Sequence, residues 1–132
     1  MRNVFDYIYY RTAKFYYKWD RETGLTAILA LTGMQALFIA EAIMIPLDLI
    51  YPMSVTRQYA KLCGYITVGI IILIGFFNFR IYYNQYGRIK SKWENEARSL
   101  IKGYLVVFIL AVPWMILIFG AIIRTAVNAM RV

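Results

Sequence analysis

Three polar residues lie inside otherwise apolar stretches of the sequence and are the best placed for chemistry: Glu41, Gln35 and Asn78. A carboxylate within a membrane helix is costly, and such residues commonly mark a path for protons or ions. Amides in lipid more often form hydrogen bonds between helices. Gln35 and Glu41 are about 120° apart around a helix, so they do not readily line one narrow pore.

Glu41 also has a simpler interpretation, because it lies shortly before Pro46, near the end of its apolar stretch. From that depth the side chain could extend to the membrane surface or pair with Arg57 or Lys61 of the next connection. Asp48 follows two helical turns later, on the same face. A structural role is therefore the favoured interpretation, and ion passage is the alternative.

No other group of residues indicates catalysis. The 132-residue chain has no histidine and a single cysteine, Cys63, which excludes an intramolecular disulfide. Without histidine, the chain lacks both the usual general base and the commonest metal ligand. The carboxylates outside the apolar stretches are interpreted as partners of nearby lysines and arginines: Asp6, Asp20, Glu22, Glu94 and Glu96. We therefore expect no catalytic residue, metal site or cofactor, and no enzyme.

The elements that position these polar residues are three long apolar stretches. Apolar residues make up 61% of the chain, against about 45–50% in soluble domains. The predicted spans are about 24–46, 62–82 and 101–123, each long enough to cross a hydrocarbon layer of ~30 Å. The predicted fold class is an all-α membrane protein, in which residues 24–132 form a bundle of three transmembrane helices.

Residues 1–23 are predicted to form an amphipathic interfacial helix that precedes the three spans. Apolar and basic residues occupy different sides of this helix: Phe5, Ile8, Thr12, Phe15 and Trp19 against Arg11, Lys14, Lys18 and Arg21. Tyrosines fill the flanks, where a wet hydroxyl is tolerated. Phe5, Phe15, Trp19 and Trp93 are the candidate interfacial anchors. A signal peptide cleaved near Ala40-Glu41-Ala42 is the alternative, but the apolar stretch is long for one.

Prolines predict where the first connection lies. Pro46 and Pro52 bracket residues 47–51, which we expect to be a short non-helical or interfacial segment. Ser54 is a plausible N-cap for the next helix.

The second helix is expected to continue to Tyr86, to end at Gly87, and to carry Tyr82, Tyr83 and Tyr86 as an aromatic belt. A third helix should begin near Ser91 and run through the membrane without interruption. Pro113 lies in the middle of that span and is a candidate kink.

Small residues indicate helix faces that permit close approach. The first span carries Gly33, Ala36 and Ala40, and the second carries Gly64 and Gly75 close to Asn78. Such positions favour association in lipid, either within one chain or between chains. The second span is expected to be the central helix, against which the other two pack.

The basic residues predict the orientation. Eleven of the fifteen lysines and arginines lie before the first span or from Arg80 to Lys102, where the second and third spans are joined, and four lie in the other two segments. The positive-inside rule therefore places the N-terminus in the cytoplasm and the C-terminus outside a plasma or inner membrane. The basic side should also contact anionic lipid headgroups. Nucleic acid is not an expected partner, because no stretch is long enough for a soluble platform.

Two functional hypotheses follow from this organisation. The first is a small non-catalytic multi-pass protein that self-associates or serves as an accessory subunit of a membrane assembly. The second is a pore-forming or membrane-permeabilising oligomer, in which Glu41 and Gln35 of several copies face a shared lumen.

Overall fold

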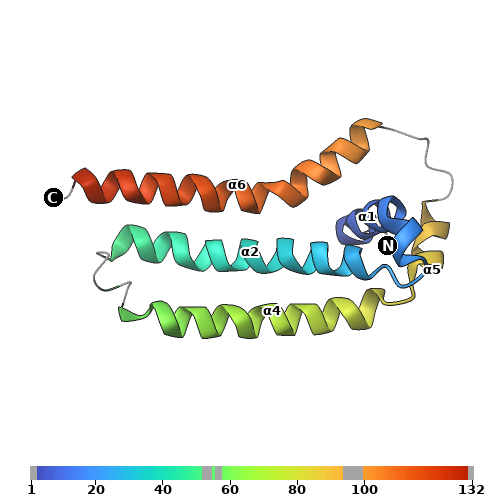
Figure 1. Ribbon diagram of the computed structural model, residues 1–132, viewed down its shortest axis with the longest axis horizontal. Coiled ribbons are helices and arrows are strands. Elements are labelled where there is room, and N and C mark those ends of the chain that lie inside the picture. The colour runs from blue at the N-terminus through green and yellow to red at the C-terminus, as the bar shows by residue number, and fades with distance from the viewer. Residues whose placement is uncertain (1–2, 52–54, 56–57, 94–99, 131–132) are drawn as a thin grey trace.

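The structure, a computed structural model, describes residues 3–51, 55, 58–93 and 100–130, and most of these residues are helical (Figure 1). The helices with defined bounds are α1 (Val4–Asp20), α2 (Leu25–Ile50), α4 (Ala60–Tyr82), α5 (Tyr86–Lys92) and α6 (Leu100–Met130). No strand occurs within these ranges. The predicted all-helical class is therefore confirmed.

Three of these helices are long and apolar enough to span a membrane. The candidate segments are Leu25–Leu47 in α2, Lys61–Tyr82 in α4 and Ile101–Val127 in α6. The shortest has 22 residues, which at 1.5 Å per residue exceeds a hydrocarbon thickness of ~30 Å. The first two predicted spans agree with these bounds to one residue, and the third continues beyond the predicted end.

The three long helices form an open row with α2 in the middle. α4 and α6 lie along opposite sides of α2 and make no extensive contact with each other (Figure 1). The prediction that the second span is central is therefore wrong. Side chains of α2 such as Leu31 and Ala36 are buried, whereas Ile72 and Phe76 of α4 are exposed. Hydropathy does not separate these cases, because a residue facing lipid is as apolar as one facing a helix.

α1 lies across the end of the row where α2 begins and α4 ends, and α5 lies at the same end (Figure 1). Asn3 caps the start of α1, and its side chain accepts a hydrogen bond from the Phe5 N–H. α1 buries Ile8, Tyr9, Tyr10, Thr12 and Ala13 against α2, α5 and α6. The predicted apolar stripe is thus divided, because Ile8 and Thr12 enter the core while Phe15 and Trp19 stay exposed. The membrane-surface position of α1 stays a prediction.

α2 continues through Pro46 to Ile50, so the prediction of a non-helical segment over residues 47–51 is wrong. Proline removes only its own N–H from the helical ladder, which costs little in the last turns of a long helix. The Tyr51 N–H still donates to the Leu47 carbonyl, 2.9 Å away, and closes the helix. Pro52, Ser54 and Arg57 lie outside the described residues.

The break between α4 and α5 lies earlier than predicted. α4 ends at Tyr82, and Asn84 adopts a left-handed conformation with φ 55°. Asparagine tolerates this region better than most residues, so it makes the turn without glycine. Gly87 lies inside α5 instead of ending a helix.

The predicted start of the third long helix is also wrong. α5 ends at Lys92 and Trp93 is in a turn, so no single helix begins at Ser91. Residues 94–99 lie outside the described residues. α6 contains Pro113, whose side chain is fully buried, and the helix is bent between its orange and red parts (Figure 1). A missing N–H at proline is a usual cause of such a bend.

Candidate functional site

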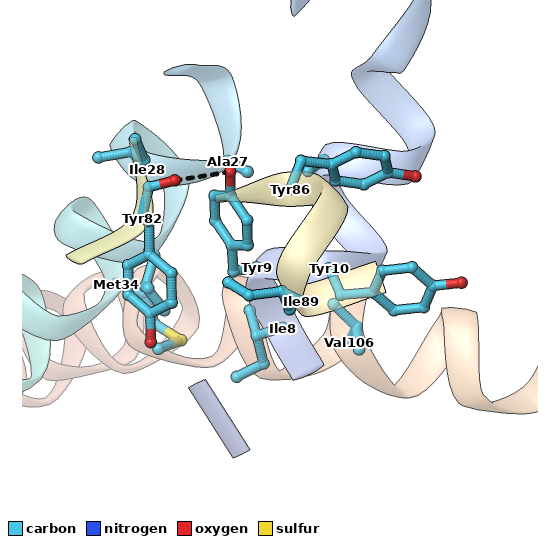
Figure 2. Packing of buried hydrophobic residues seen from close by; sticks show 12 residues of the cluster. Ile8, Tyr9, Tyr10, Ala27, Ile28, Met34, Tyr82, Tyr86, Ile89 and Val106 are labelled. Carbon is cyan, nitrogen blue, oxygen red and sulfur yellow. Dashed lines mark hydrogen bonds between the residues drawn. The ribbon is translucent and has the colours of Figure 1, made fainter. Parts of the chain in front are cut away.

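Four tyrosines join the helices at the α1 end of the row, and we call Tyr9, Tyr10, Tyr82 and Tyr86 the tyrosine junction. The rings of Tyr9 and Tyr82 stack with centroids 4.7 Å apart, and the Tyr9 hydroxyl donates to the Tyr82 carbonyl over 3.1 Å (Figure 2). That carbonyl also accepts the Gln85 N–H. Tyr9 therefore completes the hydrogen bonding at the end of α4, where the helix itself leaves carbonyls without partners.

Tyr9 also determines the turn that enters α2. Gly24 adopts φ +58°, and a Cβ placed on it would lie 2.8 Å from Cζ of Tyr9 and closer still to the hydroxyl. Only glycine combines this backbone conformation with so close an approach. The adjacent Asp20 carboxylate accepts the Thr26 N–H over 2.5 Å and so caps the first turn of α2.

Asp6 links three helices through its two carboxylate oxygens. One oxygen accepts the Tyr82 hydroxyl over 3.2 Å, and the other pairs with the Lys92 ammonium at 2.8 Å. The pair is partly exposed, so its contribution is expected to be below about 1 kcal/mol. Its effect is to hold α5 against α1 at the end of α4.

Three phenols outside the spans, those of Tyr9, Tyr17 and Tyr86, have raised pKa values. Burial, with smaller contributions from Glu22 and Asp20, raises the pKa of Tyr9 to about 12. Burial also raises the pKa of Tyr86, and the nearby Tyr10 makes the second largest contribution in the same direction. The Tyr17 hydroxyl donates to Glu22 over 2.9 Å, and this bond raises the pKa of Tyr17. These groups therefore act as hydrogen-bond donors near neutral pH and not as general bases.

Sequence reasoning missed the tyrosine junction. It places Tyr9 and Tyr10 on the wet flanks of α1 and Tyr82 and Tyr86 in an aromatic belt, but all four are buried. Of the predicted belt, Tyr83 is exposed. The sequence signal for the junction is Gly24. A glycine directly before a helix can indicate that a large side chain packs against its Cα, and here that side chain is Tyr9.

A second polar group lies between α2 and α4, inside the candidate spans. The Asn78 side-chain amide donates to Gln35 Oε1 over 2.7 Å and to Thr32 Oγ1 over 3.0 Å. The structure therefore brings two sequence-predicted residues together and adds Thr32, which the sequence did not single out. Gly75 lies beside this group, since a Cβ on it would be 3.5 Å from the Thr32 methyl.

Glu41 lies apart from that group and is 9% exposed. Neither carboxylate oxygen has a hydrogen-bond partner among the described residues, and the carboxyl lies near the backbone of Leu117 on α6. The expected partner Lys61 is exposed and forms no ion pair with it. The other expected partner, Arg57, is outside the described residues. Glu41 is therefore a buried carboxyl turned towards α6, while Gln35 is turned towards α4.

The predicted packing glycines differ in their surroundings. Gly33 and Gly64 have nothing within 4 Å of an added Cβ, unlike Gly75. Ala36 is buried and Ala40 is half-buried. Of the small residues, Gly75 and Ala36 therefore face other parts of the chain, and Gly33 and Gly64 face open space.

The predicted anchors lie on different parts of the surface. Phe5, Phe15 and Trp19 are exposed on α1, whereas Trp93 is half-buried with its ring 4.7 Å from that of Tyr7. Among the described residues, no group of three histidines, cysteines, aspartates or glutamates is arranged to hold a metal.

Comparison with the models of known protein families, with curated proteins and with solved structures found no match to this chain. Conclusions about function therefore depend on the geometry alone.

Proposed function

We propose that this protein is a non-catalytic multi-pass membrane protein that acts as a subunit of a membrane assembly, with a second copy of the same chain as its first partner. The observation that carries the proposal is the open row. α4 touches α2 along one side only, and most of its apolar side chains are exposed. Three spans in a closed bundle would cover more of that surface.

Glycines on the uncovered side of α4 support association between helices. Gly64 and Gly69 have nothing within 4 Å of an added Cβ. In lipid, helices associate through close van der Waals contact, and glycine permits the backbones to approach. Two copies that meet along this face would bury the positions that the single chain leaves open.

The test is a mass measurement, with crosslinking, on the full-length protein in nanodiscs. Gly64→Leu adds bulk where one chain has open space, so we expect fewer crosslinked dimers with no loss of monomer stability. Ile72→Leu, at an exposed α4 position, is the matched control and should leave the dimers unchanged. A strictly monomeric wild-type protein with no co-purifying partner would contradict the proposal.

We further propose that the end carrying α1 and α5 is cytoplasmic and contacts anionic lipids. Lys18, Arg88 and Lys90 are exposed at this end, which supports attraction to a negative lipid surface. In a Cys63→Ala background, Lys90→Cys should react with an impermeant maleimide only after cells are opened, whereas Ala129→Cys should react in intact cells. The reverse pattern would refute this orientation.

No observation favours the pore hypothesis over the assembly hypothesis. Gln35 accepts its hydrogen bond from α4, and Glu41 is buried near α6, so the two side chains do not share a face of α2.

A further inference from the structure

The most anomalous side chain in the described part of the protein is Glu41. It lies within the apolar segment Leu25–Leu47 and both of its carboxylate oxygens are buried without a hydrogen-bond partner there. Buried polar groups are nearly always hydrogen-bonded, so such a group requires a physical explanation. A buried charge without a partner is far more costly than a buried neutral acid.

The helices around Glu41 supply no charge that would stabilise a carboxylate. Its neighbour Leu117 on α6 offers a backbone N–H, which is uncharged and forms no hydrogen bond with either carboxylate oxygen in this structure. Residues 110–123 of α6 contain no titratable side chain, and neither do residues 66–79 of α4. α1 contacts the opposite end of α2.

The closest charged residues along these elements lie towards the far end of the row. They are Asp48 on α2, two turns beyond Glu41; Lys61 at the start of α4; and Arg124 on α6, two turns beyond Leu117. Two turns correspond to roughly 10 Å along a helix axis. Lys61 is exposed, and no ion pair joins any described residue to Glu41.

We propose that Glu41 is a proton-binding site whose occupancy is linked to the contact between α2 and α6. While the helices are packed, the carboxyl carries its proton and is neutral. When the contact opens, water reaches the carboxyl, accepts the proton and leaves the carboxylate hydrated. By linkage, loss of the proton favours the open arrangement, and packing of α6 favours proton uptake.

This site does not depend on the proposed assembly. One chain supplies both helices that enclose the carboxyl, so a monomer would bind the proton equally well. Of the possible roles for an intramembrane carboxylate, the structure favours a proton site over a metal site, because no described residue provides a second ligand beside Glu41.

The test is infrared spectroscopy of the full-length protein in lipid vesicles at neutral pH. A protonated carboxyl has its own carbonyl band, which we expect in the wild type and in Glu22→Gln but not in Glu41→Gln. Glu22 is exposed at the α1 end and is the matched control. A wild-type spectrum without that band, or a band that persists in Glu41→Gln, would overturn the proposal.

The link to helix packing is tested by the rate at which the band shifts in D2O. Val106 of α6 is 3% exposed and Val107 is 64% exposed. Val106→Ala removes buried contact from α6 at a distance from Glu41, so we expect exchange at least several-fold faster than in the wild type. Val107→Ala should exchange at the wild-type rate. Equal rates in all three proteins would show that proton release is not linked to α6 packing.

Discussion

Gly24→Ala should destabilise the protein far more than the addition of a single methyl group usually does. The substitution places a methyl group against the ring of Tyr9, which is 0% exposed, at a residue whose φ is +58°. The ring has little room to move, because it is fully buried and stacks on Tyr82 with centroids 4.7 Å apart. Either the turn into α2 or the tyrosine junction must therefore rearrange.

Three contributions set the size of the effect. A left-handed backbone costs a residue with a Cβ about 1–2 kcal/mol. Displacing the Tyr9 ring loses a stacked aromatic contact of about 1 kcal/mol. The same displacement breaks the hydrogen bond to the Tyr82 carbonyl, which contributes about 1 kcal/mol. We expect the free energy of unfolding to fall by about 3–4 kcal/mol.

The assay is reversible unfolding of the full-length protein in mixed micelles, followed by helical circular dichroism. Gly33→Ala is the control, because Gly33 lies within α2 and has nothing within 4 Å of an added Cβ. Alanine is the better helix former, so this variant should be unchanged or more stable by up to about 1 kcal/mol. The penalty of Gly24→Ala should shrink in a Tyr9→Phe background, since the hydroxyl is the closest atom. If Gly24→Ala and Gly33→Ala unfold alike, the assignment of Gly24 to the junction is refuted.

Three further predictions concern other contacts. Asn78→Leu should lower stability in the same assay by about 2 kcal/mol, because two interhelical hydrogen bonds are lost. The control Thr125→Val should change it by less than about 0.5 kcal/mol, since that hydroxyl bonds only within α6. Asp6→Asn should cost less than about 1 kcal/mol, and the difference from wild type should shrink with added salt, which screens the pair with Lys92. The raised pKa of Tyr9 predicts stability that is complete below pH 10.0 and is lost between pH 10.0 and about 12, as measured by alkaline unfolding. Tyr9→Phe should lack that part of the alkaline loss, and an identical profile would contradict the assignment.

Local signals account for most of the elements but not for their ends. Asn84 replaces the expected Gly87 as the break after α4, because a left-handed residue with a short polar side chain serves almost as well as glycine. Pro46 fails to end α2, because proline near the end of a helix removes a single hydrogen bond. The free energy that such local signals contribute to the backbone conformation is small, and the packing of a long apolar helix readily exceeds it.

The polar residues show a similar limit. The sequence singled out Gln35 and Asn78 because amides in lipid seek partners, but only the structure supplies Thr32 as the second acceptor. For Glu41 the sequence supplied the anomaly and suggested Lys61 or Arg57 as partners. The carboxyl instead faces α6, since the rotation of α2 is decided by the helices on both of its sides.

The sequence by itself determined that the chain has three apolar helices of membrane-spanning length, because length and transfer free energy are properties of each segment alone. Tertiary structure decided which helix is central, which face of α1 is buried, and that four tyrosines meet at one end of the row. Those outcomes depend on pairs of distant residues, such as Tyr9 with Tyr82 and Asn78 with Gln35. The burial of Glu41 without a hydrogen-bond partner among the described residues is also a tertiary outcome, because it depends on which groups of α6 face the carboxyl.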